Sequence, residues 1–189
     1  MEKEGQVVAR KTVKEWQLMG WKQPSPGWIK LNTDGASKGN PSPAGAGGVL
    51  RKEDGVWIVG FARYVGIATA AVAELWGVLS GLELAWELGY RHVLLEVDSL
   101  LVTRLISGSG SRAPQLRTIV RAIHSWLERD WQVEVSHQYR EGNSVADWMA
   151  RWSLSLALGL HIRHTPLPEV RALLSGDIVE VVLPRLCSI

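Results

Sequence analysis

The stretch WIKLNTDGASKGNPSPAGAGG, from Trp28 to Gly48, decides the fold of this 189-residue chain. Its first seven residues predict a β-strand that ends at Asp34. The next fourteen, residues 35–48, include five glycines, two prolines and an asparagine, a composition typical of loops. The stretch therefore predicts a strand that opens a domain and leads through a long loop to the next strand.

Downstream of this stretch, the pattern alternates between strands and helices. Asp54-Gly55 favours a tight hairpin, and Gly89 is typical of a helix end. The predicted elements are strands at 47–53 and 56–65, a helix at 69–88, a strand at 92–97, a helix opened by Asp98-Ser99 that fades into 107–114, a helix at 114–128, a strand at 131–139, and a last helix from Ser144. This order predicts an α/β fold with an antiparallel hairpin beside parallel strands joined by helical crossovers.

A proline-rich segment marks the start of the main domain. Residues 22–27, KQPSPG, cannot continue as helix, so a boundary is expected near Trp28. Residues 1–27 are then an N-terminal extension, expected to be poorly ordered. The regular pattern runs over residues 28–155 and weakens in residues 156–189, where we expect a tail with a short helix.

Composition excludes several classes of protein. Lys and Arg number 21 against 19 Asp and Glu, so net charge alone does not supply a basic surface for nucleic acid. The single cysteine, Cys187, excludes an internal disulfide framework. The longest apolar stretch, residues 69–88, contains three glutamates, and the N-terminus has no apolar signal core. We expect a soluble intracellular protein with no membrane partner, in a nuclear or cytoplasmic compartment that the sequence does not distinguish.

Four acidic residues stand at the ends or margins of predicted elements. Taken singly, each has an ordinary explanation: Asp34 fits a turn, Asp98 fits a helix cap, and Asp147 has capping-box spacing from Ser144. Glu74 is less ordinary because it lies at the margin of the apolar face of its helix. A carboxylate there is costly to desolvate unless it has a cation or a hydrogen-bond partner.

Together the four carboxylates predict a metal site. Asp34 and Asp98 both end strands of an α/β sheet, where ligands gather. Adding Glu74 and Asp147 would crowd four negative charges into one cleft, which requires divalent cations. Oxygen ligands select Mg²⁺ or Mn²⁺, and two such ions about 4 Å apart promote in-line phosphoryl displacement. The sequence therefore predicts phosphodiester hydrolysis.

At these positions the chain resembles type 1 ribonuclease H, and more narrowly the ribonuclease H domain of plant LINE-type retrotransposon reverse transcriptases. The likeness covers about residues 28–155. It rests on four motifs in order: Asp34 to Gly47, Thr69 with Glu74 five residues later, Glu96-Val-Asp98-Ser99, and Arg140-Glu-Gly-Asn143-Ser-Val-Ala-Asp147.

The resemblance implies a ribonuclease H-like fold, a five-stranded mixed sheet of three antiparallel plus two parallel strands flanked by helices. It implies that Asp34, Glu74, Asp98 and Asp147 are catalytic and bind two Mg²⁺ ions, with Mn²⁺ as a substitute. The activity implied is metal-dependent hydrolysis of the RNA strand of RNA/DNA hybrids. We expect a monomer of retroelement origin that uses no organic cofactor.

Other positions take substrate-binding roles from the same resemblance. Gly39 and Asn40 would meet the minor groove of the hybrid, and Thr69 a DNA-strand phosphate. Arg151 would lie near the phosphate path, and Asn143 belongs to the last motif. Ordinary alternatives are a surface turn for the Gly39–Asn40 loop, an N-cap for Thr69 and a solvated side chain for Arg151.

His137 precedes Asp147 by ten residues, the spacing of a family histidine that aids product release. It also fits an ordinary strand position, and Arg140 is a rival for the same work. The chain has only a short segment where bacterial relatives carry a basic handle, so the candidates to supply cations are Lys38, Arg51, Lys52 and the Lys-containing N-terminal segment. Three rival functions stay open: an inactive nucleic-acid-binding module, a strand transferase, and a degenerate inactive copy.

Overall fold

A six-stranded mixed sheet forms the centre of the protein. The computed structural model describes residues 14–108, 113–178 and 183–188. The strand order is β6-β5-β2-β3-β4-β7. An antiparallel meander consists of β2 (Ile29–Ser37), β3 (Ser42–Arg51) and β4 (Trp57–Ala68). On one side of it, β5 (His92–Val97) and β6 (Gln132–His137) run parallel to β2. On the other side, β7 (Gly159–Arg163) pairs antiparallel with β4.

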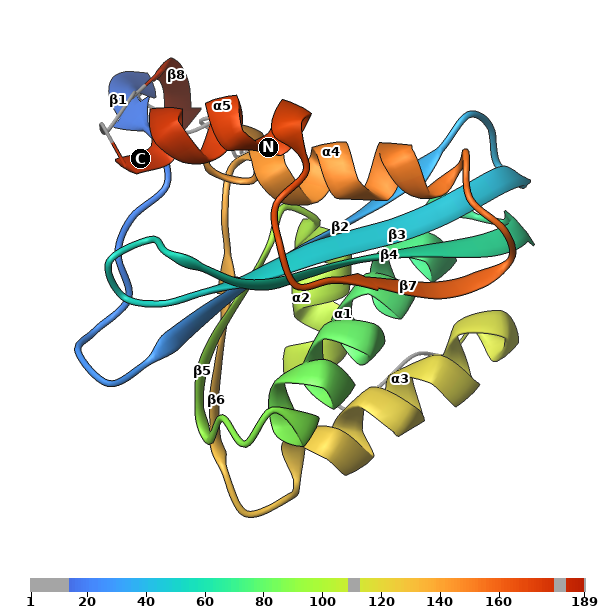
Figure 1. Cartoon of the computed structure of the whole chain (residues 1–189). Coiled ribbons are helices and arrows are strands. Elements are labelled where there is room, and N and C mark those ends of the chain that lie inside the picture. Colours follow the sequence, from blue (N-terminus) through green and yellow to red (C-terminus); the bar gives the residue numbers. More distant parts are fainter. Residues whose placement is uncertain (1–13, 109–112, 179–182, 189) are drawn as a thin grey trace, which may run out of the picture.

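Helices cover both faces of this sheet (Figure 1). On one face lie α1 (Ala70–Glu87), α2 (Leu100–Ser107) and α3 (Pro114–Leu127), which enclose the larger core. On the other lie α4 (Ser144–Ser153) and α5 (Pro168–Ile178), packed on a smaller core around Val49 and Met149. A single turn of 3-10 helix, η1 (Arg140–Gly142), precedes α4, and β1 (Lys14–Met19) pairs antiparallel with β8 (Leu183–Ser188) beside α5.

The predicted α/β fold and most predicted elements are confirmed. The hairpin between β3 and β4 turns at Gly55, whose φ of +81° lies in the left-handed region that favours glycine. Thr69 caps α1 by accepting a hydrogen bond from the amide of Val72, and Gly89 follows the helix with a φ of +85°. At the start of α2 it is Ser99, rather than Asp98, whose side chain caps the helix.

The long loop predicted for residues 35–48 is wrong. Most of these residues belong to β2 and β3, and only residues 38–41 connect the two strands. The glycines serve close packing instead of turns: a Cβ on Gly35 would lie 2.4 Å from the amide nitrogen of Glu74, and one on Gly47 would lie 2.2 Å from that of Ala150. Small residues therefore let α1 and α4 approach the two faces of the sheet.

The sheet has one strand more than the five expected. The additional strand, β7, lies after the expected main domain and joins the edge of the meander over Gly60–Arg63. This five-residue segment is too short and too exposed to show the alternation of apolar and polar residues that predicts a strand.

The expected ends of the main domain, at residues 28 and 155, stay a prediction. Residues 1–13 of the expected N-terminal extension, and residues 109–112 of the segment after α2, lie outside the described residues. The described part of the extension contains β1 and the buried Trp21, and α5 lies in the expected tail. In the described ranges, no helix has the length and apolar character needed to cross a membrane.

Candidate active site

Asp34 and Asp98 lie side by side because their strands are neighbours. Asp34 is in β2 and Asp98 directly follows β5, and the two strands pair in parallel with Thr33 opposite Val97. Glu74 comes from the second turn of α1, which the small Gly35 allows to approach β2. The three residues thus reach one point from two strands and one helix.

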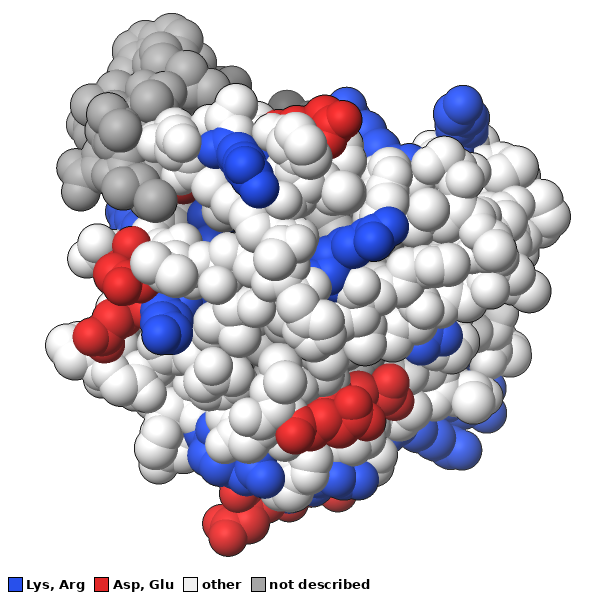
Figure 2. All heavy atoms as spheres, viewed as in Figure 1, with Lys and Arg blue, Asp and Glu red and all other residues white. Residues whose placement is uncertain are grey.

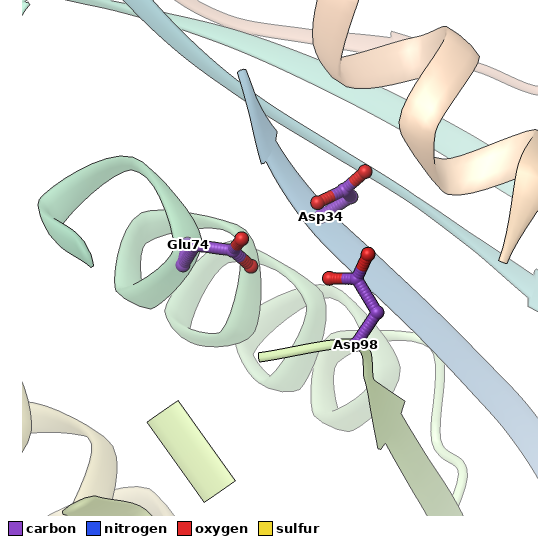
Figure 3. A group of neighbouring side chains, drawn as sticks. All are labelled: Asp34, Glu74 and Asp98. Carbon is purple, nitrogen blue, oxygen red and sulfur yellow. The ribbon is translucent and has the colours of Figure 1, made fainter. Parts of the chain in front are cut away.

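Figure 3 shows the three carboxylates turned toward one another. One oxygen of each side chain lies within 4.8 Å of the corresponding oxygens of the other two. The amide of Gly35 donates a 2.8 Å hydrogen bond to Asp34 Oδ1. Glu74 Oε2 is buried and has no hydrogen-bond partner among the described residues. The group therefore concentrates negative charge that the protein's own hydrogen bonds do not satisfy.

Burial is the main cause of raised pKa values in all three carboxyl groups. Burial and then the charge of Asp98 raise the pKa of Asp34 to about 8. Burial and then the charge of Asp34 raise the pKa of Glu74 to about 10. Burial also raises the pKa of Asp98, against the opposing effect of the Arg140 guanidinium. Ionising all three groups at neutral pH therefore needs added positive charge.

The donor set fits a divalent metal ion. Three carboxylates supply only oxygen ligands, which suit hard cations such as Mg²⁺ and Mn²⁺. The partnerless Oε2 of Glu74 is an acceptor that a cation would satisfy. The carboxylate cluster can hold a divalent ion.

Asp147 lies near the cluster but outside the group of three. It projects from α4, where Arg151 Nη2 lies 2.9 Å from Asp147 Oδ1. Asp147 and Asp34 line the same cleft of about 650 Å³, and the charge of Asp147 contributes to the raised pKa of Asp34. The residue at the N-cap of α4 is Asn143, so the ordinary capping explanation for Asp147 does not describe the structure.

Arg140 and His137 both lie beside Asp98. Arg140 Nε is 3.4 Å from Asp98 Oδ2, and the arginine side chain is 86% exposed. His137 ends β6, as the strand alternative predicted, and its Nε2 lies 3.2 Å from the backbone oxygen of Asp98. Asp98, His137 and Arg140 line a second hollow of about 240 Å³, and Arg140 also lines the larger cleft.

The predicted substrate-binding residues lie in different surroundings. Gly39, Asn40 and Arg151 are exposed, the first two at the tip of the β2–β3 hairpin. Thr69 uses its hydroxyl to cap α1. Asn143 is 1% exposed, and its side-chain amide donates a 3.0 Å hydrogen bond to the carbonyl oxygen of Thr33. This places Asn143 behind the site, where it holds α4 to β2.

One suggested cation is wrong. Arg51 is 1% exposed and forms an ion pair with Asp177 of α5, so it is not on the surface that a nucleic acid would meet. Lys38 lines the main cleft and Lys52 is exposed. The positive charges that face the cleft are Lys38, Arg140 and Arg151.

Sequence reasoning missed a set of buried polar residues behind the carboxylates. Lys30 and Asn32 precede Asp34 at alternate positions of β2, a pattern typical of a solvent-facing strand surface. Both residues are instead completely buried. The alternation of polar residues at Lys30, Asn32 and Asp34 is visible in the sequence. Its burial is not, because the covering residues Trp21 and Asp177 come from segments near the two ends of the described chain.

A mixed sheet in this order, with three carboxylates converging where the pairing of β2 with β5 ends, defines the ribonuclease H-like class of α/β proteins. The family described as reverse transcriptase-like matches residues 32–153, and the chain belongs to it. It is 43% identical over 169 residues to an Arabidopsis thaliana protein whose name places it with ribonuclease H. That match covers 89% of this chain and 27% of the relative.

Solved structures agree with this assignment. Ribonuclease H1 from the archaeon Halobacterium salinarum is 31% identical with a TM-score of 0.64, covering 69% of this chain and 99% of that one. LC11-RNase H1, solved in complex with an RNA/DNA hybrid, is 29% identical with a TM-score of 0.63, covering 67% and 96%. The curated Halobacterium ribonuclease HI sequence is 34% identical, and the chain spans 65% of its length.

Proposed function

We propose that this protein is an endonuclease that hydrolyses the RNA strand of RNA/DNA hybrids, with Mg²⁺ as its metal and Mn²⁺ as a substitute. The observation that carries the proposal is the convergence of Asp34, Glu74 and Asp98. Hybrid-bound LC11-RNase H1 shares the fold at 29% identity and supports the choice of substrate. The reverse transcriptase-like family supports a retroelement origin.

Asp34, Glu74 and Asp98 would hold the metal ions, with Asp147 as a further and more exchangeable ligand. A bound pair of divalent ions lowers the pKa of the attacking water and neutralises charge on the scissile phosphate. Water adds to phosphorus as the bond to the 3′ oxygen breaks, which leaves a 3′-hydroxyl and a 5′-phosphate on the RNA. Asp34 and Asp98 orient the centre from rigid strands, and Glu74 lies opposite them on α1.

The charges around the cleft support a phosphate-bearing substrate. Lys38, Arg140 and Arg151 line the cleft that also contains Asp34 and Asp147. On the face in Figure 2, by contrast, basic and acidic side chains are scattered among uncharged ones. The local cations, rather than net charge, would hold the backbone of the hybrid. Gly39 and Asn40, at the exposed hairpin tip, would meet its minor groove.

The test is cleavage of a duplex whose RNA strand carries an end label. With Mg²⁺, wild-type protein is expected to cut the RNA of an RNA/DNA hybrid and to leave double-stranded DNA of the same sequence intact. The Asp98→Asn variant keeps the shape of the side chain and removes a charged ligand, so its rate is expected to fall by roughly 100-fold or more. Chelation by EDTA should abolish the wild-type activity.

Equal rates for wild-type and Asp98→Asn would reject the catalytic assignment. Hybrid binding without cleavage at saturating Mg²⁺ and Mn²⁺ would instead indicate the alternative function, a non-catalytic nucleic-acid-binding module. Binding is measured by fluorescence anisotropy on the same labelled hybrid. Products joined to a target DNA would indicate strand transfer.

A further inference from the structure

A buried polar network lies directly behind the carboxylates. It contains two cations, Lys30 and Arg51, two carboxylates, Glu96 and Asp177, and the amide of Asn32. None of these five residues is more than 9% exposed. Burying four charged groups is costly unless each is paired, and even a paired buried charge often adds little net stability.

The contacts form one connected path from α5 to β5. Arg51 pairs with Asp177 and also donates from Nη2 to Asn32 Oδ1 at 3.0 Å. Asn32 Nδ2 donates to Glu96 Oε2 at 3.1 Å. Lys30 Nζ donates to Glu96 Oε1 at 2.7 Å. The contacts join α5 to β3, β3 to β2 and, twice, β2 to β5, so the path fixes these four elements to one another.

Three residues, two in the network and one bonded to it, each precede a residue of the site by two positions. Asn32 precedes Asp34 on β2, and side chains two apart on a strand share a face. Glu96 precedes Asp98, and Gln138, whose amide lies 3.4 Å from Glu96 Oε2, precedes Arg140. Asn32 and Glu96 are also direct partners in the β2–β5 register. The network therefore underlies the strand ends that carry the site.

Segments from both ends of the described chain close the network. The indole of Trp21 donates a 3.2 Å hydrogen bond to Asn32 Oδ1, and its ring lies 4.2 Å from the Arg51 guanidinium. Asp177 comes from the last turn of α5. Figure 1 shows α5 beside α4, above the sheet.

We propose that Asn32, Arg51, Glu96 and Asp177 are positioning residues, which hold Asp34 and Asp98 at the spacing that a metal ion requires. This inference rests on the proposed function. Mutual repulsion of the carboxylates would push Asp34 on β2 and Asp98 at the end of β5 apart, and the hydrogen bond between Asn32 and Glu96 opposes that separation. Helix α5 then serves metal binding, through Asp177 and Arg51, although it lies outside the residues that match the family.

The decisive variant replaces one link of the path with apolar side chains. Arg51→Met combined with Asp177→Leu removes both partners of a buried ion pair, which often leaves stability unchanged. It also removes the donor from Arg51 to Asn32. Glu96→Gln is a second, independent variant: it keeps the shape of the side chain but turns an amide donor toward either Lys30 or Asn32. Ile119→Val, in the core on the other face, is the control for a general loss of stability.

The readout is Mn²⁺ affinity without substrate, by titration calorimetry of the full chain, together with Tm and the kinetics of hybrid cleavage. For both network variants we expect the Kd for Mn²⁺ to rise by roughly threefold to tenfold. The metal concentration for half-maximal cleavage should rise in parallel, while KM for the hybrid at saturating metal stays unchanged. Ile119→Val should lower Tm and leave the Kd at the wild-type value.

Three results would overturn the inference. A folded Arg51→Met/Asp177→Leu protein with the wild-type Kd would show that α5 has no part in positioning. If that protein does not fold, a wild-type Kd for Mn²⁺ in the Glu96→Gln variant would equally reject a positioning role for the network. Failure of the wild-type protein itself to bind Mn²⁺ would reject the proposed function, and with it this inference. If the wild-type protein binds Mn²⁺ and both network variants bind it with the same Kd, only the inference is rejected and the proposed function stands.

Discussion

The side-chain amide of Asn143 donates a 3.0 Å hydrogen bond to the carbonyl oxygen of Thr33, the residue directly before Asp34. Asn143 is also the N-cap residue of α4, and its own carbonyl accepts from the amide of Asp147. This one residue therefore connects the strand that carries Asp34 with the helix that carries Asp147.

Replacing Asn143 with Asp is expected to loosen that connection. An ionised aspartate has the same shape but cannot donate to the carbonyl of Thr33, so two acceptors would face each other. The lost buried hydrogen bond should lower the free energy of unfolding by about 1–3 kcal/mol, measured by urea denaturation. Hybrid cleavage should fall as well. Ser144→Ala, at the next residue, is the control, and equal stability of Asn143→Asp and wild type would contradict the account.

Gly47→Ala is expected to displace α4. A Cβ at this position would lie 2.2 Å from the backbone nitrogen of Ala150, which cannot move without the helix. Such overpacking costs about 1–3 kcal/mol, and the shift of Asp147 should also reduce hybrid cleavage. Pro43→Ala, at an exposed position of the same strand, is the control. A wild-type Tm for Gly47→Ala would show that the helix does not pack as described.

Gly35 and Gly47, at the contacts with α1 and α4, illustrate where the fold could be predicted from sequence and where it could not. Helices and central strands were predictable because periodicity and caps are local, as at Thr69 and Gly89. The loop predicted for residues 35–48 failed because glycine has two uses, in turns and at close contacts between elements. Only the position of α1 and α4 tells these uses apart, and that is tertiary information. Strand β7 was missed because a short edge strand is specified by its neighbour β4.

Asp34→Asn is expected to abolish cleavage and to stabilise the metal-free protein. Burial and the charge of Asp98 raise the pKa of Asp34 to about 8, so ionising this carboxyl destabilises the folded state. An amide has nearly the same shape and does not ionise. In EDTA at pH 8.5 the variant should unfold at a higher urea concentration than wild type, with a smaller difference at pH 5. A lower midpoint at both pH values would contradict the charge argument.

Stability without metal should fall as pH rises. The pKa of Asp34 is raised from 3.8 to about 8 and that of Glu74 from 4.5 to about 10, so the folded chain binds more protons than the unfolded chain above about pH 4. The free energy of unfolding then decreases with pH, by at most about 1.4 kcal/mol per pH unit for each proton. The contribution is fully present below about pH 4 and is lost as pH rises through the folded pKa values.

Urea denaturation at pH 5.5, 7.0 and 8.5 in EDTA measures this slope. Saturating Mn²⁺ should flatten it, because the cation favours the ionised carboxylates of the folded state. Glu134→Gln, at an exposed glutamate outside the carboxylate cluster, is the control and should keep the wild-type slope in EDTA. Stability that rises with pH in EDTA would mean that the carboxylates are not buried together.

The carboxylates could be predicted from sequence because strand ends and helix margins are visible in one dimension. Asp98 follows the end of β5 as predicted, Asp34 lies three residues before the end of β2 rather than at it, and Glu74 departs from the solvent side of its helix. The network behind them could not be predicted in the same way. Asp177 lies 126 residues from Arg51, and only the fold brings this pair together. Asn143 was expected at the substrate, and its burial followed from the docking of α4 on β2.

Anomalous diffraction from crystals soaked in Mn²⁺ tests the central claim most directly. The account predicts a manganese peak coordinated by oxygens of Asp34, Glu74 and Asp98, and its loss in crystals of the Asp98→Asn variant. Well-diffracting crystals with saturating Mn²⁺ and no peak at these carboxylates, or with a peak that survives in the variant, would contradict it.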